Sequence, residues 1–441
     1  MAAGTSPAAN SFFRAGDLRT LHRSCEDGSF IENRKAVRIM EESALMSTQD
    51  VQTAKRPVVV VAPDSFKGSL TAIEAADAMR TGILRVWPEA VVRCFPMADG
   101  GEGMIDSLIS CGGQRRLVQA RDARGVEREV LCGVLPMGVV AIESAQIVGI
   151  IDALNLSIPV GDRSTLGVGD AIRKAIDDGA TRITIGLGGS CTNDGGAGLL
   201  VALGLRLLDA EDHDLQPTPG GMAGLARVDA SALDPRLKHI DLQVLSDVNS
   251  PLTGEAGATA VFGPQKGVTK EQVGVFDARL AHFADCLESA MQQSARDLPG
   301  SGAAGGLGFA LRMLGATLRP GAEVIADVIG LEAALADATL VITGEGASDR
   351  QTVRGKTPFV VSTRARKQGK PVVLLSGYVA PDSLAELGEH FLACLSCVPG
   401  PVELAWAMKN AALCVANTTE QIVRLATCSG GIAGSGRASR M

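Results

Sequence analysis

The stretch IGLGGSCTNDGGAGLLVALG, residues 185–204, links two apolar runs through a loop of glycine and small polar residues. Six of its first fourteen residues are glycine. Glycine lacks a Cβ and admits positive φ, so successive backbone N–H groups can turn toward a ligand. A helix that starts just beyond adds free N–H donors and the positive end of its dipole. The stretch therefore predicts a strand, an anion-binding loop and a helix; the alternative is a tight turn whose glycines serve packing alone.

Strands and helices alternate on both sides of this stretch. PVVVVAP (57–63) is a continuous β-branched run, typical of a parallel strand buried on both faces, and Thr71 with Glu74 has the capping-box spacing of a helix start. Short runs between about 116 and 150 predict hairpins, and regular alternation returns from ATLVITGEG (338–346) onward. Further helices are expected over 165–178, 195–208, 269–296 and 358–368.

This alternation predicts an α/β protein of two domains, in which a mixed α/β domain is inserted into a parallel-sheet domain. We expect the discontinuous parallel-sheet domain to comprise residues 57–115 and 297–427. The inserted domain is expected to comprise residues 116–296.

The two ends of the chain differ in texture from the rest. Residues 1–56 lack a sustained hydrophobic period and the apolar region of a secretory signal, which predicts a disordered extension. Translation from Met46 is one alternative. An organelle-targeting signal is another, because the opening contains arginine and no acid before Asp17. Residues 428–441 are expected to be a flexible tail.

The composition is that of a globular protein. With 46% hydrophobic and 21% charged residues, the 441-residue chain can form a large core. The net charge of -7 and the lack of a basic block argue against a nucleic-acid partner, and no apolar run is long enough for a membrane span. The ten cysteines are scattered, and the CxxC of Cys394 and Cys397 has no second pair to complete a zinc site. We therefore expect reduced thiols and a cytoplasmic protein.

Polar, glycine-rich loops follow several of the predicted strands. Because the carboxyl ends of parallel strands meet at one edge of a sheet, these loops are expected to gather around a ligand. Carboxylates at such positions suit Mg²⁺ with a nucleotide, and loop lysines supply positive charge to a phosphoryl group in transfer. The candidate residues in these loops are Asp64, Ser65, Lys67, Asp99, Glu102, Ser190, Thr192, Asn193, Asp194, Asp247, Lys266, Glu345, Asp349 and Lys356.

Two common nucleotide-binding motifs are missing from the sequence. GKT at 355–357 would belong to a P-loop only with glycine at position 350, which is Arg350. No GxGxxG follows the first predicted strand, which argues against a dinucleotide site. The polar loops also contain no histidine, which argues against a hydrolase that uses a histidine base.

The chain resembles the glycerate kinase family, the type that includes bacterial D-glycerate 2-kinases. The similarity runs in order from about residue 57 to residue 427, and its central glycine motif is highly specific. The segments that carry the resemblance are VVVAPDSFKGSLTAIEAADAM, FPMADGGEGMIDSL, TLGVGDAIRKAIDDGATRITIGLGGSCTNDGGAGLLVALG, VFGPQKG, GSGAAGGLGFAL and LVITGEG with DRQTVRGKTPFVV.

The resemblance implies ATP-dependent phosphorylation of D-glycerate, with Mg²⁺ as cofactor and 2-phosphoglycerate as the favoured product. It implies a flavodoxin-like parallel-sheet domain and an active site in the cleft between the two domains. A homodimer is one assembly that the chain could form. We expect Asp194 to accept the proton of the substrate hydroxyl and Lys67 to be the second catalytic residue. Asp99 and Glu102 belong to a further loop of the site. The expected ligands of the metal are Asp247, Glu345 and Asp349, and the expected substrate and phosphate contacts are Asp64, Ser65, Gly188, Gly189, Ser190, Thr192, Asn193, Lys266 and Lys356.

Structural roles are the alternatives for three of these side chains. Asp194 could cap the helix that follows it, since aspartate at a strand–helix junction often does so. Lys67 could be a solvated loop lysine, and Asp349 could be a turn residue. Cys191, inside the glycine motif, is expected to fill a position for a small residue rather than to act as a nucleophile.

Two loops depart from the pattern of the family. The chain reads GEGASD, with Ala347 and Ser348, where the family usually reads close to GEGRxD, and it reads DVNSPL (247–252) in place of DVxNPL. A missing arginine beside the phosphates could lower activity or change the substrate anion. A ligand-binding homologue with impaired catalysis is therefore one alternative function, and a nicotinamide oxidoreductase is another.

Overall fold

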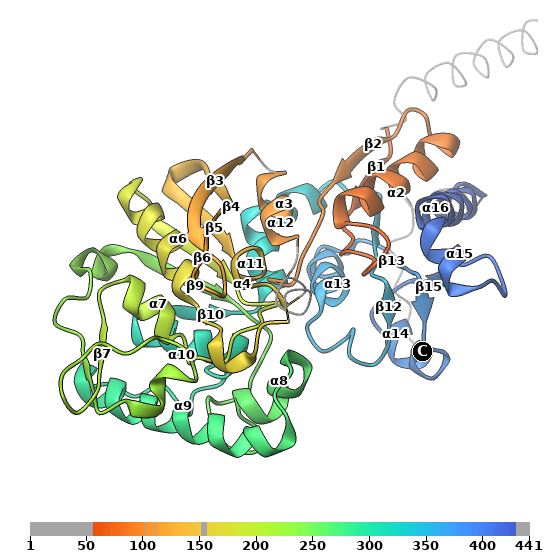
Figure 1. The fold of residues 1–441 in the computed structure, drawn as a ribbon. Helices are drawn as coiled ribbons and strands as arrows, with labels where there is room; N and C mark the ends of the chain where they lie inside the picture. The colour runs from red at the N-terminus through yellow and green to blue at the C-terminus, as the bar shows by residue number, and fades with distance from the viewer. Residues whose placement is uncertain (1–55, 102, 111, 151–156, 429–441) are drawn as a thin grey trace, which may run out of the picture. The chain divides into compact units, whose positions relative to one another are not determined.

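Residues from both ends of the described chain form one five-stranded parallel sheet. The structure is a computed structural model and describes residues 56–101, 103–110, 112–150 and 157–428 (Figure 1). The order of the strands is β15-β13-β11-β1-β2, which is the 2-1-3-4-5 order of flavodoxin-like sheets when read from β2. The strands are β1 (Val58–Val61), β2 (Val91–Cys94), β11 (Leu340–Thr343), β13 (Val372–Ser376) and β15 (Ala393–Ser396).

A second sheet is formed by the middle of the chain. Its order is β10-β9-β6-β5-β4-β3, in which β3, β4 and β5 pair antiparallel and the remaining neighbours pair parallel. The strands are β3 (Gln114–Arg121), β4 (Glu127–Leu135), β5 (Val139–Glu143), β6 (Arg182–Gly186), β9 (Asp241–Leu245) and β10 (Thr317–Arg319). The predicted α/β class, with a parallel sheet built from two separate parts of the chain and a mixed sheet between them, is therefore confirmed.

The strand β10 lies within the range 297–427, which we expected to belong to the parallel-sheet domain. It pairs with β9, so this strand is part of the six-stranded sheet instead. Two small sheets complete the strands of the described residues: β12 (Ala347–Ser348) pairs with β14 (Tyr378–Val379), and β7 (Arg206–Leu208) pairs with β8 (Arg227–Asp229).

Helices follow most of the parallel strands. The α-helices are α2 (Ala72–Val86), α3 (Met104–Ile109), α4 (Ser144–Val148), α6 (Leu166–Asp177), α7 (Ala197–Ala202), α8 (Ala258–Lys266), α9 (Lys270–Met291), α10 (Leu307–Met313), α11 (Gly321–Val328), α12 (Leu331–Leu335), α13 (Thr357–Lys367), α14 (Leu384–Gly388), α15 (Leu404–Lys409) and α16 (Ala411–Cys428). The 3-10 helices are η2 (Pro136–Gly138), η3 (Val160–Asp162), η4 (Gly221–Gly224), η5 (Pro235–His239), η6 (Ala303–Gly306) and η7 (Pro381–Ser383). The predicted capping box is present, with Thr71 at the N-cap of α2 and Glu74 bonded back to it.

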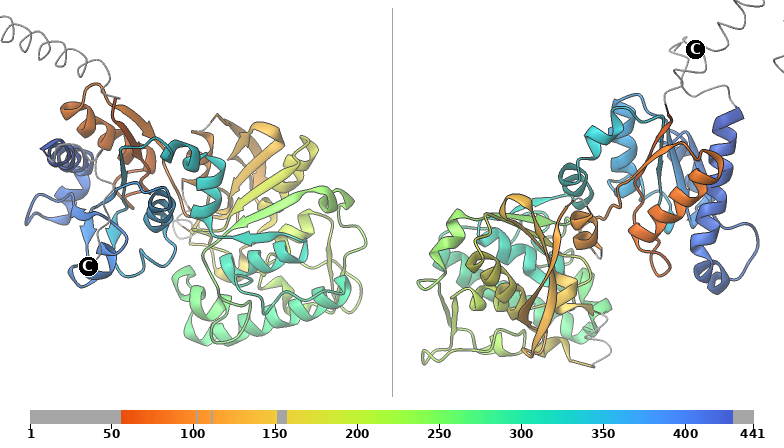
Figure 2. Two further views of the ribbon diagram at one scale, coloured as in Figure 1. Left: turned by 180° about the vertical axis from the view of Figure 1, so that it is seen from behind. Right: turned by 90° about the horizontal axis from the view of Figure 1, so that it is seen from above.

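The five-stranded sheet is buried on both faces, as its β-branched strands predict. Val59 and Val61 share one face with the buried side chains of α2 and α16, which lie side by side in both views of Figure 2. Val60, which points to the other face, belongs to a second cluster with residues of α11, α12 and α13. This second cluster also includes Ala141 and Leu245 of the six-stranded sheet, so the two sheets share part of their core.

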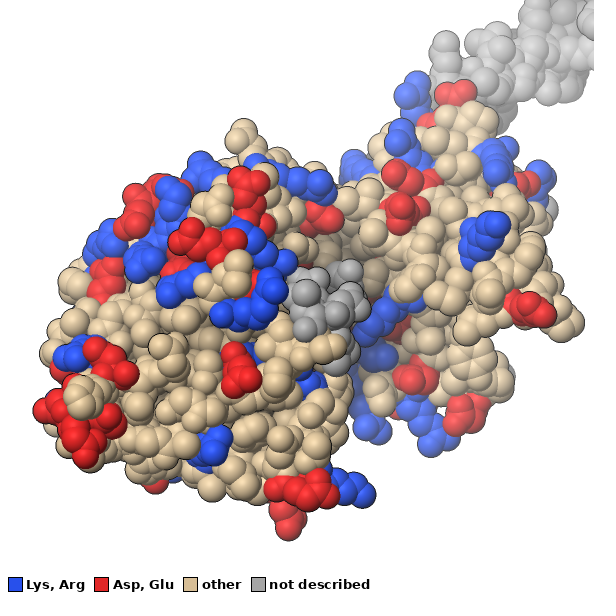
Figure 3. All heavy atoms as spheres, viewed as in Figure 1, with Lys and Arg blue, Asp and Glu red and all other residues tan. Residues whose placement is uncertain are grey.

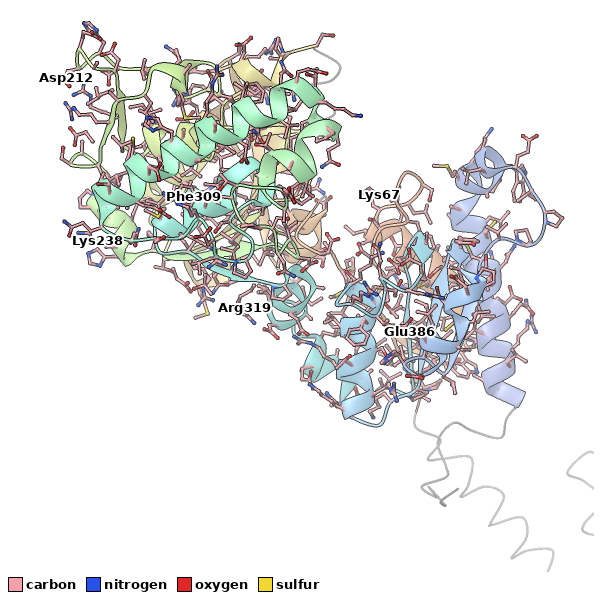
Figure 4. All side chains as sticks on the ribbon, turned by 90° about the horizontal axis from the view of Figure 1, so that it is seen from below. Lys67, Asp212, Lys238, Phe309, Arg319 and Glu386 are labelled. Carbon is pink, nitrogen blue, oxygen red and sulfur yellow. The ribbon has the colours of Figure 1, made fainter. Side chains whose placement is uncertain are left out.

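The largest cluster of buried apolar residues surrounds the six-stranded sheet. Phe309, labelled in Figure 4, packs edge-to-face on Phe283 of α9 with ring centroids 6.3 Å apart. On the outside of this sheet, β3, β4 and α6 present charges of both signs side by side (Figure 3), including the ion pairs of Asp178 with Arg116 and with Lys174. Within the described residues, no helix is both long enough and apolar enough to cross a membrane.

Candidate active site

The predicted polar loops lie at the carboxyl ends of the parallel strands. In the five-stranded sheet, Asp64 follows β1, Asp99 follows β2 and Glu345 follows β11. In the six-stranded sheet, Asp247 follows β9 and the glycine motif follows β6. Because the strand order reverses between β1 and β11, Asp64 and Glu345 flank the position where sheets of this type bind ligands.

Asp64 forms hydrogen bonds with its own loop, with the loop after β11 and with the start of α13. Its Oδ2 accepts a hydrogen bond of 2.7 Å from the Thr357 hydroxyl at the start of α13, and its Oδ1 accepts one of 2.6 Å from the Ser65 backbone N–H. Its own N–H donates to the carbonyl of Gly344 after β11. Burial, together with the negative charges of Asp99 and then Glu345, raises the pKa of Asp64 to about 7, against the opposing effect of its hydrogen bonds. A carboxyl with this pKa exchanges a proton near neutral pH.

Asp99 and Asp247 form the next pair of carboxylates. Asp247 Oδ1 accepts a hydrogen bond of 3.3 Å from the Gly321 N–H, and Asp99 Oδ1 accepts one of 3.0 Å from the Gly101 N–H. Partial burial and the charge of Asp99 raise the pKa of Asp247 to about 6. The charge of Asp99 thus acts on both Asp64 and Asp247, so Asp64, Asp99, Asp247 and Glu345 form one group, which we call the acidic group.

Glu345, a member of the acidic group, and Asp349 lie near a cation. The Nζ of Lys356 is 3.9 Å from Glu345 Oε2 and 3.9 Å from Asp349 Oδ1. Glu345 is buried, and its Oε1 accepts hydrogen bonds from the hydroxyls of Ser348 and Thr352. Burial raises the pKa of Glu345, whereas Lys356 and the two hydroxyls lower it. Asp349 also accepts a hydrogen bond from the Gln351 N–H, as in the turn that was its alternative role.

Lys67 and Ser65 lie beside a cavity of about 360 Å³. Lys67, labelled in Figure 4, is exposed on the loop between β1 and α2. The lining also includes Glu143, at the end of β5, and Gln146, in α4. Glu143 is buried, and its Oε1 accepts a hydrogen bond of 2.6 Å from the Ile105 N–H in α3. The cavity is therefore lined by a cation, a hydroxyl, an amide and a carboxylate.

Asp194 belongs to the glycine motif, and its carboxylate is fully buried. Its Oδ2 accepts hydrogen bonds from the Thr165 N–H (2.8 Å) and hydroxyl (2.7 Å) and from the Gly198 N–H (3.2 Å). Its Oδ1 accepts one from the Gly196 N–H (3.1 Å). Burial raises the pKa of Asp194, while these hydrogen bonds lower it. These contacts favour the capping role that was the alternative for Asp194, because its carboxylate accepts four hydrogen bonds from the protein, two of them from N–H groups at the start of α7.

The glycine motif also packs closely against neighbouring backbone. A Cβ on Gly188 would lie 2.6 Å from the Cα of Gly101, and Gly189 has a φ of +71°. Ser190, Thr192 and Asn193 are buried, and the amide of Asn193 donates to the Thr259 hydroxyl at 3.0 Å. The strand–loop–helix unit that we predicted is present, formed by β6, the motif and α7. The burial of its polar side chains favours packing, and phosphate binding at this loop stays a prediction.

Lys266 is the last residue of α8, and its side chain is buried instead of exposed to a ligand. Its Nζ donates a hydrogen bond of 2.7 Å to the carbonyl of Thr192. The guanidinium of Arg163 donates to the carbonyls of Cys191 (3.0 Å) and Lys266 (2.8 Å). Burial lowers the pKa of Lys266 to about 8. Lys266 therefore stabilises the backbone of the glycine motif through this hydrogen bond, and its expected contact with a phosphate stays a prediction.

Sequence reasoning missed several groups that shape this site. The hydroxyl of Thr357, at the start of α13, donates to Asp64, and the hydroxyl of Thr352 donates to Glu345. A threonine at such a position carries no specific sequence signal. Glu143 ends an apolar strand, and this position was a usable signal for a buried carboxylate near the carboxyl edge of the sheet. Glu102, which we expected in the same loop as Asp99, lies outside the described residues.

Comparisons with known proteins agree on one family. The model of the glycerate kinase family matches residues 59–427. A protein named glycerate kinase from Bacillus subtilis strain 168 is 43% identical over 372 residues, which cover 82% of this chain and 96% of that protein. Glycerate 2-kinase of Escherichia coli K12 is 40% identical over 332 residues, which cover 74% of this chain and 86% of that protein. A crystal structure titled as glycerate kinase 2 from Salmonella typhimurium LT2 aligns with a TM-score of 0.77 and 38% identity, over 85% of this chain and all of that chain (100%).

Proposed function

Because this chain belongs to the glycerate kinase family, we propose that it transfers the γ-phosphoryl group of ATP to a hydroxyl of D-glycerate, with Mg²⁺ as cofactor. We propose 2-phosphoglycerate as the product, in line with the name of the relative from Escherichia coli. The observation that carries the proposal is the acidic group at the carboxyl ends of strands from both sheets. It supports a reaction between a parallel-sheet domain, proposed to comprise 57–115 and 297–427 without β10, and an inserted domain, proposed to comprise 116–296 together with β10.

The residues present fit a magnesium ion. Mg²⁺ is held in nucleotide sites by one or two carboxylates together with phosphate oxygens. Asp99 and Asp247 offer two carboxylates whose negative charges repel each other. This repulsion contributes to the raised pKa of Asp247. A bound divalent cation relieves this repulsion and would neutralise the charge that builds up on the transferred phosphoryl group. We therefore propose Asp99 and Asp247 as its ligands. Glu345 and Asp349, which we also expected to bind the metal, lie beside Lys356.

Asp64 is the carboxylate that best suits the role of general base. A base is most effective when its pKa is close to the working pH, and the pKa of Asp64 is about 7. Each of its oxygens accepts one hydrogen bond, from Thr357 or from Ser65, so each oxygen keeps a lone pair that can accept a proton. Asp194, our first choice from the sequence, already accepts four hydrogen bonds from the protein and is fully buried. We propose that Asp64 accepts the proton of the substrate hydroxyl and that Asp194 supports the fold.

Lysines would balance the negative charge of the substrates. Lys67 and Ser65 line the cavity next to Asp64, where a carboxylate of glycerate could pair with the exposed ammonium group. Lys356, 3.9 Å from the carboxylates of Glu345 and Asp349, would be available to phosphate oxygens. Phosphoryl transfer depends on such positioning and charge, and it requires little covalent chemistry from the protein. We therefore propose for Lys67 the catalytic role that we expected from the sequence.

A coupled assay with identification of the product tests this function. The full chain is incubated with ATP, MgCl₂ and D-glycerate, and ³¹P NMR distinguishes 2-phosphoglycerate from 3-phosphoglycerate; L-glycerate and samples with EDTA are the controls. We expect ADP and 2-phosphoglycerate in equal amounts. A folded sample that consumes no ATP above background would contradict the proposal.

The departure at Ala347 and Ser348 favours one second candidate, a homologue that binds these ligands without turnover. Ala347 is exposed and carries no charge where the family pattern has arginine, while Ser348 donates to Glu345. Calorimetric titration with ATP and D-glycerate separates the two candidates. Binding of both ligands with no product would support the second candidate.

A further inference from the structure

Gly321 is the first residue of α11, directly after the end of β10. Its backbone N–H donates a hydrogen bond of 3.3 Å to Asp247 Oδ1. The end of β9 is tied to the end of β10 as well, since the Ser246 N–H donates to the carbonyl of Arg319 at 3.2 Å. One side of Gly321 therefore fixes the carboxylate of Asp247.

The other side of Gly321 touches the loop that carries Asp99. A Cβ at position 321 would lie 1.9 Å from the carbonyl oxygen of Asp99, 2.2 Å from its carbonyl carbon and 2.6 Å from the Gly100 nitrogen. All three atoms belong to the backbone, which cannot turn aside as the end of a side chain can. Only glycine at position 321 allows the Asp99 loop to come this close.

The same residue thus contacts both carboxylate-bearing loops. The negative charge of Asp99 raises the pKa of Asp247, and the Gly101 N–H donates a hydrogen bond to the Asp99 carboxylate. Two like charges held side by side repel, so such an arrangement is useful where a cation is bound. Any side chain at position 321 would push the Asp99 loop away from Asp247.

We propose that Gly321 is a positioning residue, which holds Asp99 and Asp247 at one place as joint ligands of a single divalent cation. The identity of that cation as the Mg²⁺ of the reaction rests on the function proposed above. The joint binding of one ion by Asp99 and Asp247 depends on the geometry around Gly321 and can be measured without turnover.

Titration of the full chain with Mn²⁺ alone, followed by the EPR signal of the free ion, tests the proposal. We expect Gly321→Ala to weaken Mn²⁺ binding by about 10-fold to 100-fold, the usual range for loss of a group that orients metal ligands. The matched control is Gly274→Ala in α9, where a new Cβ meets nothing within 4 Å, and it should bind Mn²⁺ as the natural chain does. A folded Gly321→Ala chain with natural Mn²⁺ affinity would overturn the proposal.

A mutant cycle keeps the proposal testable if Gly321→Ala fails to fold. Asp99 is exposed and Asp247 is only partly removed from solvent, so Asp99→Asn and Asp247→Asn should fold. Ligands of one ion are coupled, so the double variant should lose far less affinity than the product of the two single losses. Single losses that multiply would indicate two separate ions and overturn the inference. Coupled losses in a chain that does not phosphorylate glycerate would contradict the proposed function alone.

Discussion

Asp64 and Asp194 show how two carboxylates beside glycine-rich loops acquire different roles. Asp64 has one hydroxyl and one N–H as partners and lies among other acids. Asp194 receives four hydrogen bonds from its own surroundings, three of them from backbone N–H groups. The sequence places both residues in similar loops, and only the count of partners in three dimensions separates a candidate base from a cap.

The first prediction concerns Asp194→Asn. The amide would turn an N–H₂ toward either the Gly196 N–H or the donors at Oδ2, so a buried donor would lose its acceptor. We expect a loss of about 1–3 kcal/mol in the free energy of unfolding, the usual cost of such a group. The rate of the folded fraction should change little. Denaturant unfolding measures the stability, and the glycerate assay measures kcat. A fall in kcat of about a hundredfold with unchanged stability would indicate that Asp194 is the base.

The second prediction is a pH dependence that comes from Asp64. A base acts only when it is deprotonated, and burial with neighbouring charge raises the pKa of Asp64 to about 7. We therefore expect kcat/KM to rise by about tenfold per pH unit below pH 7 and to level off above it. The rate profile of Asp64→Asn should be much lower and should lack this rise. An unchanged acid limb in that variant would assign the titration to another group.

The third prediction compares two lysines that the sequence treats alike. Lys67 is exposed beside the cavity, whereas Lys266 is buried with its Nζ on the Thr192 carbonyl. Lys67→Met should lower kcat/KM by about a hundredfold, the scale for loss of a charge-stabilising donor, and should leave the melting temperature unchanged. Lys266→Met should change the melting temperature and leave KM for ATP unchanged. Loss of ATP affinity in Lys266→Met would support the phosphate contact that we expected from the sequence.

At the scale of elements, hydrophobic period and capping predicted most of what the structure contains. The helix expected over 165–178 is α6, and the one over 358–368 is α13, each within about a residue of the prediction. The helix expected over 195–208 is shorter, because α7 ends at Ala202 and the chain enters β7 at Arg206. Gly204, with a φ of +109°, ends that helix, although the surrounding apolar residues continue its period.

The fourth prediction tests whether the loop between β6 and α7 binds phosphate. Gly189→Val should cost about 1–2 kcal/mol of stability, because the φ of +71° is unfavourable for a residue with a Cβ. If the loop holds a phosphate, the variant should also lose ATP binding. Gly179→Val is the matched control: φ is +84° there, and a Cβ meets nothing within 4 Å. Equal ATP affinity in both variants, by calorimetric titration, would mean that the glycines serve packing alone.

At the scale of the whole molecule, the sequence predicted which loops gather but not which side chains face one another. Parallel strands bring their carboxyl ends to one edge, and this rule located Asp64, Asp99 and Glu345 near each other. The contact of Gly321 with the Asp99 loop joins residues more than two hundred positions apart, and no local pattern indicates it. Likewise, β10 carries too short an apolar run to indicate which of the two sheets it joins.

The last prediction concerns the residues that precede the family match. The match begins at residue 59, and the aligned part of this chain already covers 96% of the relative from Bacillus subtilis. Ordering a residue costs about 1–2 kcal/mol of backbone entropy, and residues 1–45 offer too little periodic apolar surface to offset it. Deleting them, so that the chain starts at Met46, should therefore leave both the melting temperature and kcat/KM unchanged. A thermal melt and the glycerate assay on both chains measure this. A lower melting temperature in the shortened chain would mean that these residues contribute to the fold, and a lower kcat/KM alone would mean that they contribute to the site.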